Sequence, residues 1–476
     1  MKTALLILVL LSNLVSASEP INIESRRELF IDDFLIESLE NAEIRLSTPR
    51  DEGPVHKFDK SWEGPFCGYS TVIKDGGRYL LYYRGLPKSG KDGSEDETTC
   101  IITSTDGINW TRPELSNFLK KKYPRNNIIL ANAAPVTHNF SPFLDTNPNV
   151  IPDQKFKALG GTEKSGLIAY SSEDGFHWKK LSQNAVFKDG IFDSQNVSFW
   201  SEHEKCYVCY FRTWTGGGYS GYRSVSRTTS KDFINWTIPT KMKFGDTPSE
   251  HLYTNQTHPY FRAPQIYIGI AARFMPGRRI LSKDEAKIIG VNPSYFNDCS
   301  DVVILSSRGG NSYKRKFMES FLRPGIGLEN WVSRSNYPAL NIVQTSSNEM
   351  SFYVNQNYAQ SSSCIHRYSL RIDGISSIYA GFSPGTVITK PFIFKGKQLH
   401  MNYSTSAAGG IKVSILDNSK SPYKSFDIDN AIESIGNYID RIIKWKNIND
   451  LSSLEGKIVR LKIELKDANL YSLRFN

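Results

Sequence analysis

Short runs of alternating hydrophobic and polar residues cover most of the chain, which is the pattern of β-strands with one buried face. Examples are YSTVIKD, RYLLYYRG and TCIITST in the first quarter and QIYIGIAARF and CIHRYSLRI further on. Gly, Asp, Asn, Ser and Pro separate these runs, as expected for strands joined by turns. The pattern therefore predicts an all-β protein.

A repeated motif with the consensus S-x-D-G-x-x-W divides the strands into groups. It occurs at Ser104–Trp110, Ser172–Trp178 and Ser230–Trp236, and in a degenerate form at Ser307–Tyr313. Each copy follows a strand-like run: CIITST, LIAYSS, YRSVSRTTS and VVILSS. Asp and Gly suit a tight turn, and the following aromatic residue is placed to pack back over the hairpin. The repeat predicts the outer hairpin of a β-propeller blade; ordinary turns in a β-sandwich are the alternative.

Five blades follow from this repeat, a number within the usual range for propellers. We expect them over residues 62–113, 138–178, 193–236, 250–313 and 329–374, with a long insertion near residues 278–298. The segment 27–37, with the sequence RELFIDDFLIE, is expected to close the ring as the outer strand of the last blade.

Two further segments flank the propeller, which is expected to span residues 18–380. Short, evenly spaced runs from QLHMNYST to LYSLRF predict a C-terminal β-sandwich over residues 384–476. At the other end, Lys2 precedes an apolar run that is followed by the small residues Ser16, Ala17 and Ser18. This order predicts a signal peptide at residues 1–17 and a secreted or periplasmic protein. The apolar run is shorter than the ~20 residues that a membrane span requires.

Charge and cysteine content restrict the choice of partners and cofactors. The net charge of +10 is spread along the chain, which indicates a solvated surface or attraction to an acidic or sulfated polysaccharide. No nucleic-acid motif, P-loop, GxGxxG or HExxH pattern is present. Cys67 and Cys100 are candidates for a disulfide on neighbouring strands, whereas Cys206 and Cys209 face opposite sides of one strand. We expect no cofactor and no membrane insertion; a structural calcium ion has no EF-hand-type loop to support it.

Candidate site residues come from the starts of the five blades, because the inner strands of a propeller converge on its axis. Carboxylates or amides stand at nearly every start. Glycoside hydrolysis commonly uses two carboxylic acids on either side of the scissile bond. We expect Glu250 as general acid, Asp193 as base or nucleophile and Glu63 as a third carboxylate. For each of them the alternative is a cap or a turn partner.

The expected substrate-binding residues supply ring faces, hydrogen bonds and positive charge. Arginines after strand runs suit a carboxylate or sulfate group, or hold a catalytic acid in place. The full set is Trp62, Tyr253 and Trp331 as faces for sugar rings; His138, Asn139, Asp145, Asn196, His251, Gln256, Glu329 and Asn336 as polar contacts; and Arg84, Arg212 and Arg273 as cations.

The repeat, the acidic blade starts and the trailing sandwich resemble the five-bladed propeller glycoside hydrolases, namely invertases, levanases, arabinanases and xylosidases. The chain also resembles secreted proteins regarded as distant members of that class. The resemblance implies one catalytic carboxylate on each of the first three blades. The WMNDPNG, RDP and EC motifs of these enzymes are absent, and WEGP, DSQN and EHLYTNQ stand in comparable places. Neither the triad nor the substrate is therefore carried over.

Three functions remain open from the sequence. The first is a secreted glycoside hydrolase acting on a poly- or oligosaccharide. The second is a non-catalytic carbohydrate-binding propeller. The third is a polysaccharide lyase, in which Tyr253 or His251 removes a proton beside a uronate that Arg273 neutralises. The sandwich braces the propeller or binds glycan.

Overall fold

The computed structural model describes residues 19–446 and 448–476, so the predicted signal peptide lies outside the described residues. The chain forms two compact units. One contains Leu29–Asp32 and Ile44–Ile378; the other contains Asp33–Glu43 and Tyr379–Asn476 together with residues that precede Leu29. Strands β2 (Glu28–Leu29), β4 (Glu43–Leu46) and β26 (Ser376–Ala380) span points at which the chain passes between the units. In the described part of the chain, no helix has the length and hydrophobicity to cross a membrane.

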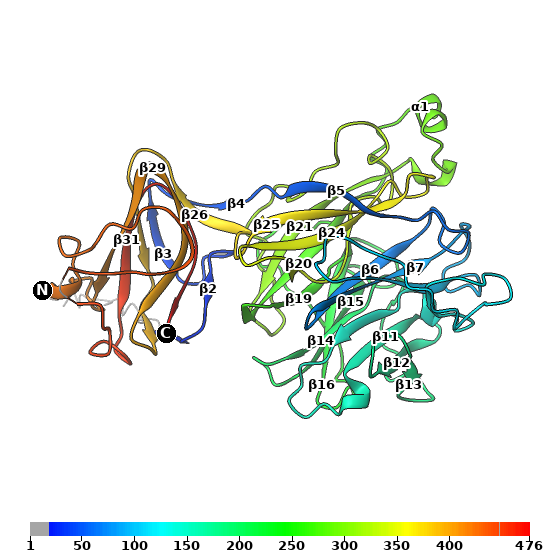
Figure 1. Cartoon of the computed structure of the whole chain (residues 1–476), viewed down its shortest axis with the longest axis horizontal. Coiled ribbons are helices and arrows are strands. Elements are labelled where there is room, and N and C mark those ends of the chain that lie inside the picture. The colour runs from blue at the N-terminus through cyan, green and yellow to red at the C-terminus, as the bar shows by residue number, and fades with distance from the viewer. Residues whose placement is uncertain (1–18, 447) are drawn as a thin grey trace, which may run out of the picture. The chain divides into compact units, whose positions relative to one another are not determined.

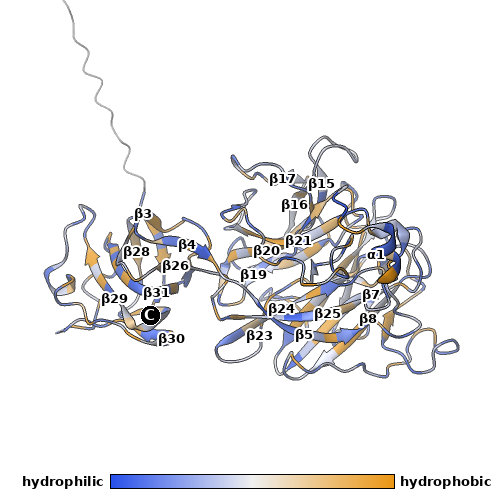
Figure 2. Ribbon diagram, turned by 90° about the horizontal axis from the view of Figure 1, so that it is seen from above, coloured by the Kyte–Doolittle hydropathy of each residue, from blue (hydrophilic) through white to orange (hydrophobic). Residues whose placement is uncertain are grey.

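The larger unit is a five-bladed β-propeller, as the repeat predicted (Figure 1). Each blade is an antiparallel sheet, and hydrophobic and polar residues alternate along its strands (Figure 2). The first three blades are β6 (Gly68–Asp75), β7 (Arg78–Gly85), β8 (Thr98–Ser104) and β9 (Ile128–Leu130); β10 (Ser141–Leu144), β11 (Phe156–Thr162), β12 (Gly166–Ser172) and β13 (Lys179–Lys180); and β14 (Val197–Ser201), β15 (Cys206–Trp214), β16 (Arg223–Ser230) and β17 (Thr240–Lys241).

In the last two blades the innermost strand is split into two short pieces. The fourth blade contains β18 (Leu252–Thr254), β19 (Thr257–Tyr260), β20 (Ala263–Met275) and β21 (Cys299–Ser307). The fifth contains β22 (Tyr337–Pro338), β23 (Val343–Gln344), β24 (Glu349–Gln356), β25 (Cys364–Arg371) and β5 (Arg50–Lys57). The predicted insertion lies between β20 and β21 and carries the helix α1 (Lys283–Ile288) and the 3-10 turn η3 (Pro293–Tyr295).

The strand that closes the ring is β5, which pairs antiparallel with β25. The sequence prediction placed segment 27–37 there and was wrong; its last two residues instead begin β3 (Ile36–Glu40), which pairs with β27 (Gly385–Thr389) in the other unit. The polar sequence RDEGPVHK of β5 contains Gly53 and Pro54, a pattern that is typical of a loop. An edge strand tolerates both residues, because only one of its sides must hydrogen-bond to a neighbour.

The S-x-D-G-x-x-W copies form the outer turns of their blades, in agreement with the prediction. In the first three copies the Asp carboxylate accepts hydrogen bonds from the two backbone N–H groups at the second and third following positions. The Ser hydroxyl accepts a further N–H, and the Trp indole donates back to the turn. The turns also contact the preceding blade: Tyr353 packs against Trp110, and Tyr82 packs against Trp178.

A further, unpredicted contact between an outer turn and the preceding blade joins the fourth and fifth blades. Asp373, at the end of β25, accepts a hydrogen bond of 2.8 Å from the hydroxyl of Tyr260 in the fourth blade. Its backbone N–H donates to the same hydroxyl. The sequence RIDG retains only the Asp-Gly of the consensus, so this turn was not recognised from the pattern.

We expect Gly175→Ala to destabilise the propeller by about 2 kcal/mol or more, measured by urea unfolding. Gly175 has φ +84°, and a Cβ there would lie 2.6 Å from the Tyr82 hydroxyl of the neighbouring blade. Gly245→Ala is the matched control, since Gly245 has φ +60° but no atom within 4 Å of the added Cβ. Equal losses in the two variants would show that the contact between blades contributes nothing.

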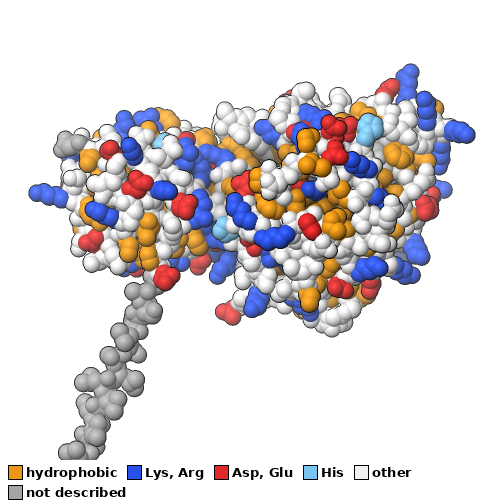
Figure 3. All heavy atoms as spheres, turned by 90° about the horizontal axis from the view of Figure 1, so that it is seen from below, with side chains coloured by type: hydrophobic (Ala, Val, Ile, Leu, Met, Phe, Trp, Pro, Cys, Tyr) orange, Lys and Arg blue, Asp and Glu red, His pale blue; other side chains and the backbone are white. Residues whose placement is uncertain are grey.

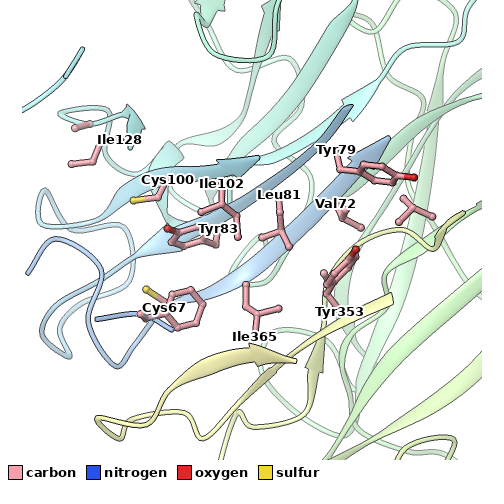
Figure 4. Packing of buried hydrophobic residues seen from close by; sticks show 14 residues of the cluster. Cys67, Val72, Tyr79, Leu81, Tyr83, Cys100, Ile102, Ile128, Tyr353 and Ile365 are labelled. Carbon is pink, nitrogen blue, oxygen red and sulfur yellow. The ribbon is translucent and has the colours of Figure 1, made fainter. Parts of the chain in front are cut away.

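Buried side chains fill the spaces between blades. Figure 4 shows one such cluster, in which Leu81 and Tyr83 of the first blade face Tyr353 and Ile365 of the fifth. Cys67 and Cys100 both lie in this cluster, as free thiols rather than the disulfide considered from the sequence. Cys206 and Cys209 belong to clusters on opposite faces of β15, as predicted for strand residues three apart.

The second unit is a mostly antiparallel, sandwich-like assembly. Its main sheet contains β3, β27, β31 (Arg460–Phe475), β29 (Leu399–Leu416) and β30 (Asn437–Ile442). β1 (Ile21–Glu24) pairs with β28 (Phe392–Phe394) in parallel. The predicted runs QLHMNYST and IKVSIL are one continuous strand, because the register shift between Thr405 and Gly410 forms a bulge where a turn was expected. KSFDID forms the 3-10 turn η4 (Lys424–Phe426) instead of a strand.

Candidate functional site

The starts of the inner strands bring together one side chain from each blade. These are Tyr69, His138, Asp193, Tyr253 and Tyr337, in chain order. The Tyr69 hydroxyl donates to the carbonyl of Asp193 at 3.2 Å, and its ring lies 5.5 Å from the His138 ring. The rings of Tyr253 and Tyr337 are 4.9 Å apart. We call these five residues, with Arg84, Arg212, Arg223 and Arg334, the central cluster.

Asp193 is the partly exposed carboxylate of the central cluster. Its Oδ2 accepts a hydrogen bond of 2.9 Å from Arg212, and its side chain is 25% exposed. Its Oδ1 has no hydrogen-bond partner in the described structure. The buried amide of Asn139 donates to the carbonyls of Phe192 and Ser194 on either side of Asp193. One carboxylate oxygen is thus fixed, and the other is unoccupied by protein.

Three guanidinium groups surround the ring of Tyr253. Their central carbons lie 4.1 Å (Arg212), 5.4 Å (Arg223) and 5.8 Å (Arg334) from the ring centroid. Such distances are in the range of cation–π contacts. Burial alone would raise the pKa of Tyr253, but the positive charges of Arg334 and Arg212 hold it below its ordinary value of 10. By contrast, burial raises the pKa of Tyr337 well above that value.

The ring of His138 packs edge-on against the ring of Tyr69. Its Nδ1 lies 2.8 Å from the Glu97 carboxylate and 3.2 Å from Arg84. Its Nε2 is buried without a hydrogen-bond partner and lies 3.9 Å from the carboxylate of Asp92. Asp92 and Glu97 belong to the loop between β7 and β8. The Nδ1 atom of His138 is therefore held by protein groups, whereas its Nε2 atom has no hydrogen-bond partner in the described structure.

Three residues near this end of the inner strands have a left-handed backbone. The φ angles are +52° for Tyr69, +45° for Gln256 and +60° for Arg334. The left-handed region is unfavourable for residues other than Gly, Asn and Asp. Strain of this kind persists where the surrounding structure holds it, and it is common at functional sites.

Glutamine side chains link the blades beneath the central cluster. Gln256 donates to Gln195 at 2.6 Å and to the carbonyl of Pro338 at 2.7 Å. Gln195 in turn donates to Ser70 and Thr71 of the first blade. A cavity of about 640 Å³ lies at the other ends of the inner strands, lined by side chains that include Phe199 and His258. Gln256, predicted to bind the sugar, thus ties blades together in this structure.

Glu63 lies outside the central cluster in a buried ion-pair network. Its Oε1 is 2.9 Å from Arg112 Nε, and the Tyr83 hydroxyl donates to the same oxygen at 2.5 Å. Its Oε2 accepts hydrogen bonds from Arg112 and from the backbone of Lys60. The side chain is 0% exposed. Both oxygens are occupied, which favours a structural role.

Glu250 is also held between cations. Arg273 lies 2.7 Å from one of its oxygens and Arg315 lies 2.9 Å from the other. Arg273 additionally binds Asp301 at 2.6 Å. No hydrogen bond or ion pair links this group to Asp193 among the described residues. The structure thus brings Asp193 alone of the three predicted carboxylates into the central cluster.

The remaining predicted residues divide in the same way. His138, Asp193, Tyr253, Arg84 and Arg212 belong to the central cluster, with Asn139 directly behind it. His251 borders the cluster, since its Nδ1 accepts a hydrogen bond from the backbone of Arg223 and its ring packs against Tyr222. The others have contacts elsewhere: Trp62 with Asn127; Asp145 with Lys157 and Tyr207; Asn196 with Phe192; Glu329 with Leu328; Trp331 with Gly325; and Asn336 with Asn330 and Ser300.

Sequence reasoning missed Tyr69, Arg223, Arg334 and Tyr337. Tyr69 and Tyr337 lie at the starts of inner strands, but the predicted aromatic residues were Trp62, Tyr253 and Trp331. Arg334 lies just before β22 in the segment SRSNYP, from which Asn336 was chosen instead. Attention to every polar or aromatic residue at these starts would have found three of the four.

Tyr295 of the insertion borders the cluster. It lies under Arg334 at 5.3 Å, packs against Tyr358 at 5.4 Å and forms a hydrogen bond of 2.8 Å with Ser89.

Within the described residues, no group of three or more His, Cys, Asp or Glu side chains is arranged to hold a metal ion. On the face in Figure 3, Lys and Arg side chains are scattered among Asp and Glu, unlike the gathered arginines of the central cluster.

No protein-family model matches the chain. A search of curated proteins also finds no match. Among solved structures, a β-1,2-mannobiose phosphorylase from Listeria innocua is similar, with 10% identity over 71% of this chain and 98% of that one and a TM-score of 0.44. A fructofuranosidase from Schwanniomyces occidentalis has 11% identity over 88% and 96%, with a TM-score of 0.40.

A third similar structure is an N-acetylgalactosamine deacetylase from F. plautii, solved with blood group B trisaccharide. It has 13% identity over 70% of this chain and 96% of that one, with a TM-score of 0.45. Glycoside hydrolases are thus found among the similar structures, as the resemblance noted in the sequence led us to expect. Because the identities and TM-scores are low, the substrates of these proteins do not transfer to this chain.

Proposed function

We propose that this protein is a secreted carbohydrate-active enzyme that cleaves glycosidic bonds of a poly- or oligosaccharide at the central cluster. The observation that carries the proposal is the Asp193 carboxylate. Arg212 fixes one of its oxygens, the other is a buried acceptor without a protein partner, and the side chain as a whole is 25% exposed where five blades meet. The apolar N-terminal run followed by small residues supports export.

The surroundings of Asp193 suit a sugar. The buried rings of Tyr253 and Tyr337 pack beside it, and His138 Nε2 and the Tyr337 hydroxyl are buried polar atoms without partners in the described structure. Sugar-binding sites commonly combine apolar side chains with a few fixed polar groups. In the proposed hydrolysis, Asp193 acts as base or nucleophile. Tyr253 acts as acid, because its lowered pKa eases proton release.

A lyase is the second candidate, and the environment of Tyr253 favours it. A phenol whose pKa is lowered by Arg212 and Arg334 is a better source of phenolate, which removes a proton beside a sugar carboxylate. In that reaction Tyr253 takes the proton, and the electron pair of the broken C–H bond forms a C=C bond. The C–O bond on the adjacent carbon breaks, and the leaving oxygen takes up a proton.

The two reactions are separated by their products. We expect the purified mature protein to release new reducing ends from at least one polymer in a panel of neutral, uronic and sulfated polysaccharides. Hydrolysis gives no ultraviolet absorbance, whereas elimination gives an unsaturated product that absorbs. Binding to a polymer without any product would contradict both reactions and would favour the carbohydrate-binding propeller.

A further inference from the structure

The central cluster contains more arginines than carboxylates that pair with them. Arg84 lies 3.8 Å from Glu97, and Arg212 lies 2.9 Å from Asp193. Arg223 and Arg334 form no ion pair in the described part of the chain. Both side chains are partly exposed and contact aromatic rings: Arg223 lies over Trp214 and Phe274, and Arg334 over Tyr295 and Tyr358.

Unpaired cations that share one partly buried space repel each other, and burial disfavours their charge. Both effects act on Arg223, whose pKa is lowered by burial and by the nearby Arg212, whereas Tyr253 raises the pKa of Arg334 well above its ordinary value. Local arrangements that oppose stability are expected mainly where function requires them. An anionic ligand would supply the charge that the protein itself does not.

Unpartnered donors lie in the same cluster. The Nε atoms of Arg84, Arg212 and Arg223 are buried and have no hydrogen-bond partner in the described structure. Arg84 and Arg212 are 6% and 4% exposed as whole residues. Guanidinium groups bind carboxylates and sulfates through paired N–H donors, so they suit planar or tetrahedral oxyanions more than neutral hydroxyls.

We propose that Arg223 and Arg334 bind an anionic group of the saccharide, so that the substrate class is a uronate-bearing or sulfated glycan. This inference rests on the proposed function for the statement that the ligand is a sugar. The geometry that supports it is the placement of both partly exposed guanidinium groups around the one ring of Tyr253. Arg334 lies just before β22, and Arg223 is the first residue of β16, so the two arginines reach the cluster from different blades.

Calorimetric titration of the mature protein with D-glucuronate, D-glucose 6-sulfate and D-glucose tests the inference. We expect at least one charged sugar to bind and D-glucose to bind much more weakly. The Arg334→Asn variant should lose at least about tenfold in affinity for the charged sugar, because a charge-assisted hydrogen bond is removed. Asn tolerates the left-handed backbone at this position, so the fold should be retained.

Arg223→Gln provides a second variant without a positive-φ constraint, and Arg125→Gln is the matched control. The Arg125 side chain is 81% exposed and lies outside the cluster, so its loss should leave binding unchanged. A preference for glucuronate or for the sulfate tells which oxyanion is recognised. Equal binding of D-glucose, no binding of either charged sugar, or equal effects of all three substitutions would overturn the inference.

The outcome is separable from that of the proposed function. Binding of a charged sugar that depends on Arg334, without cleavage of any polymer, would refute the enzyme and leave the anion site standing. Cleavage of a neutral polymer by a protein that binds no charged sugar would leave the enzyme standing and refute the anion site.

Discussion

Asp193→Asn is expected to lower kcat about 10²–10⁴-fold on whichever polymer the mature protein cleaves, the usual contribution of a positioned acid–base group. The substitution is isosteric, and its amide oxygen still accepts the hydrogen bond from Arg212 Nη1. Asn139 still holds the carbonyls beside position 193. Geometry and substrate affinity should therefore change little. Initial rates and KM by reducing-end release, with unfolding measured in parallel, check this result.

Glu250→Gln is the control for Asp193→Asn. Because Arg273 and Arg315 occupy both carboxylate oxygens of Glu250, its neutralisation should lower the midpoint of thermal unfolding and leave kcat within a few-fold of the native value. The reverse result, with activity lost in Glu250→Gln at unchanged stability and retained in Asp193→Asn, would move the catalytic carboxylate to the Glu250 ion-pair group with Arg273 and Arg315.

Much of the propeller could be predicted because its blades repeat a local motif. The turn of S-x-D-G-x-x-W depends on contacts within seven residues, so each copy reports its own hairpin. The strand that closes the ring could not be predicted in this way. β5 pairs with β25 across more than three hundred residues, and its polar sequence carries no sign of that partner.

The candidate site was predictable to a lesser degree, for a related reason. Asp193, Glu63 and Glu250 look alike as carboxylates near the start of a blade. Only the folded chain shows that Arg112 comes from the far end of the same blade to bind Glu63, and Arg315 to bind Glu250. The start of a strand thus fixes which end of the channel a residue approaches, while more distant arginines decide which carboxylates remain available to a ligand.

Glu63→Gln is expected to lower the free energy of unfolding near pH 7 by about 3–5 kcal/mol, the usual cost of breaking a buried ion pair. Gln keeps the shape of Glu but leaves Arg112 without its charged partner in a site where the carboxylate is 0% exposed. Urea unfolding measures the change. Asp59→Asn is the matched control: Asp59 also binds Arg112 at 2.9 Å, but its side chain is 56% exposed, so its loss should cost less than about 1 kcal/mol.

The same substitution should also alter the pH dependence of stability. Burial would raise the pKa of Glu63, but the groups around it, His56 and Arg112 first, lower it from 4.5 to about 2. Because the folded pKa lies below the unfolded value, the stabilisation is present above about pH 4.5 and is lost as the pH falls towards 2. The difference in unfolding free energy between the native protein and Glu63→Gln should therefore shrink by about 2 kcal/mol between about pH 6 and about pH 3. A difference that stays constant over that range would mean that Glu63 titrates normally in the folded protein, and the network around Arg112 would then hold an ordinary carboxyl group.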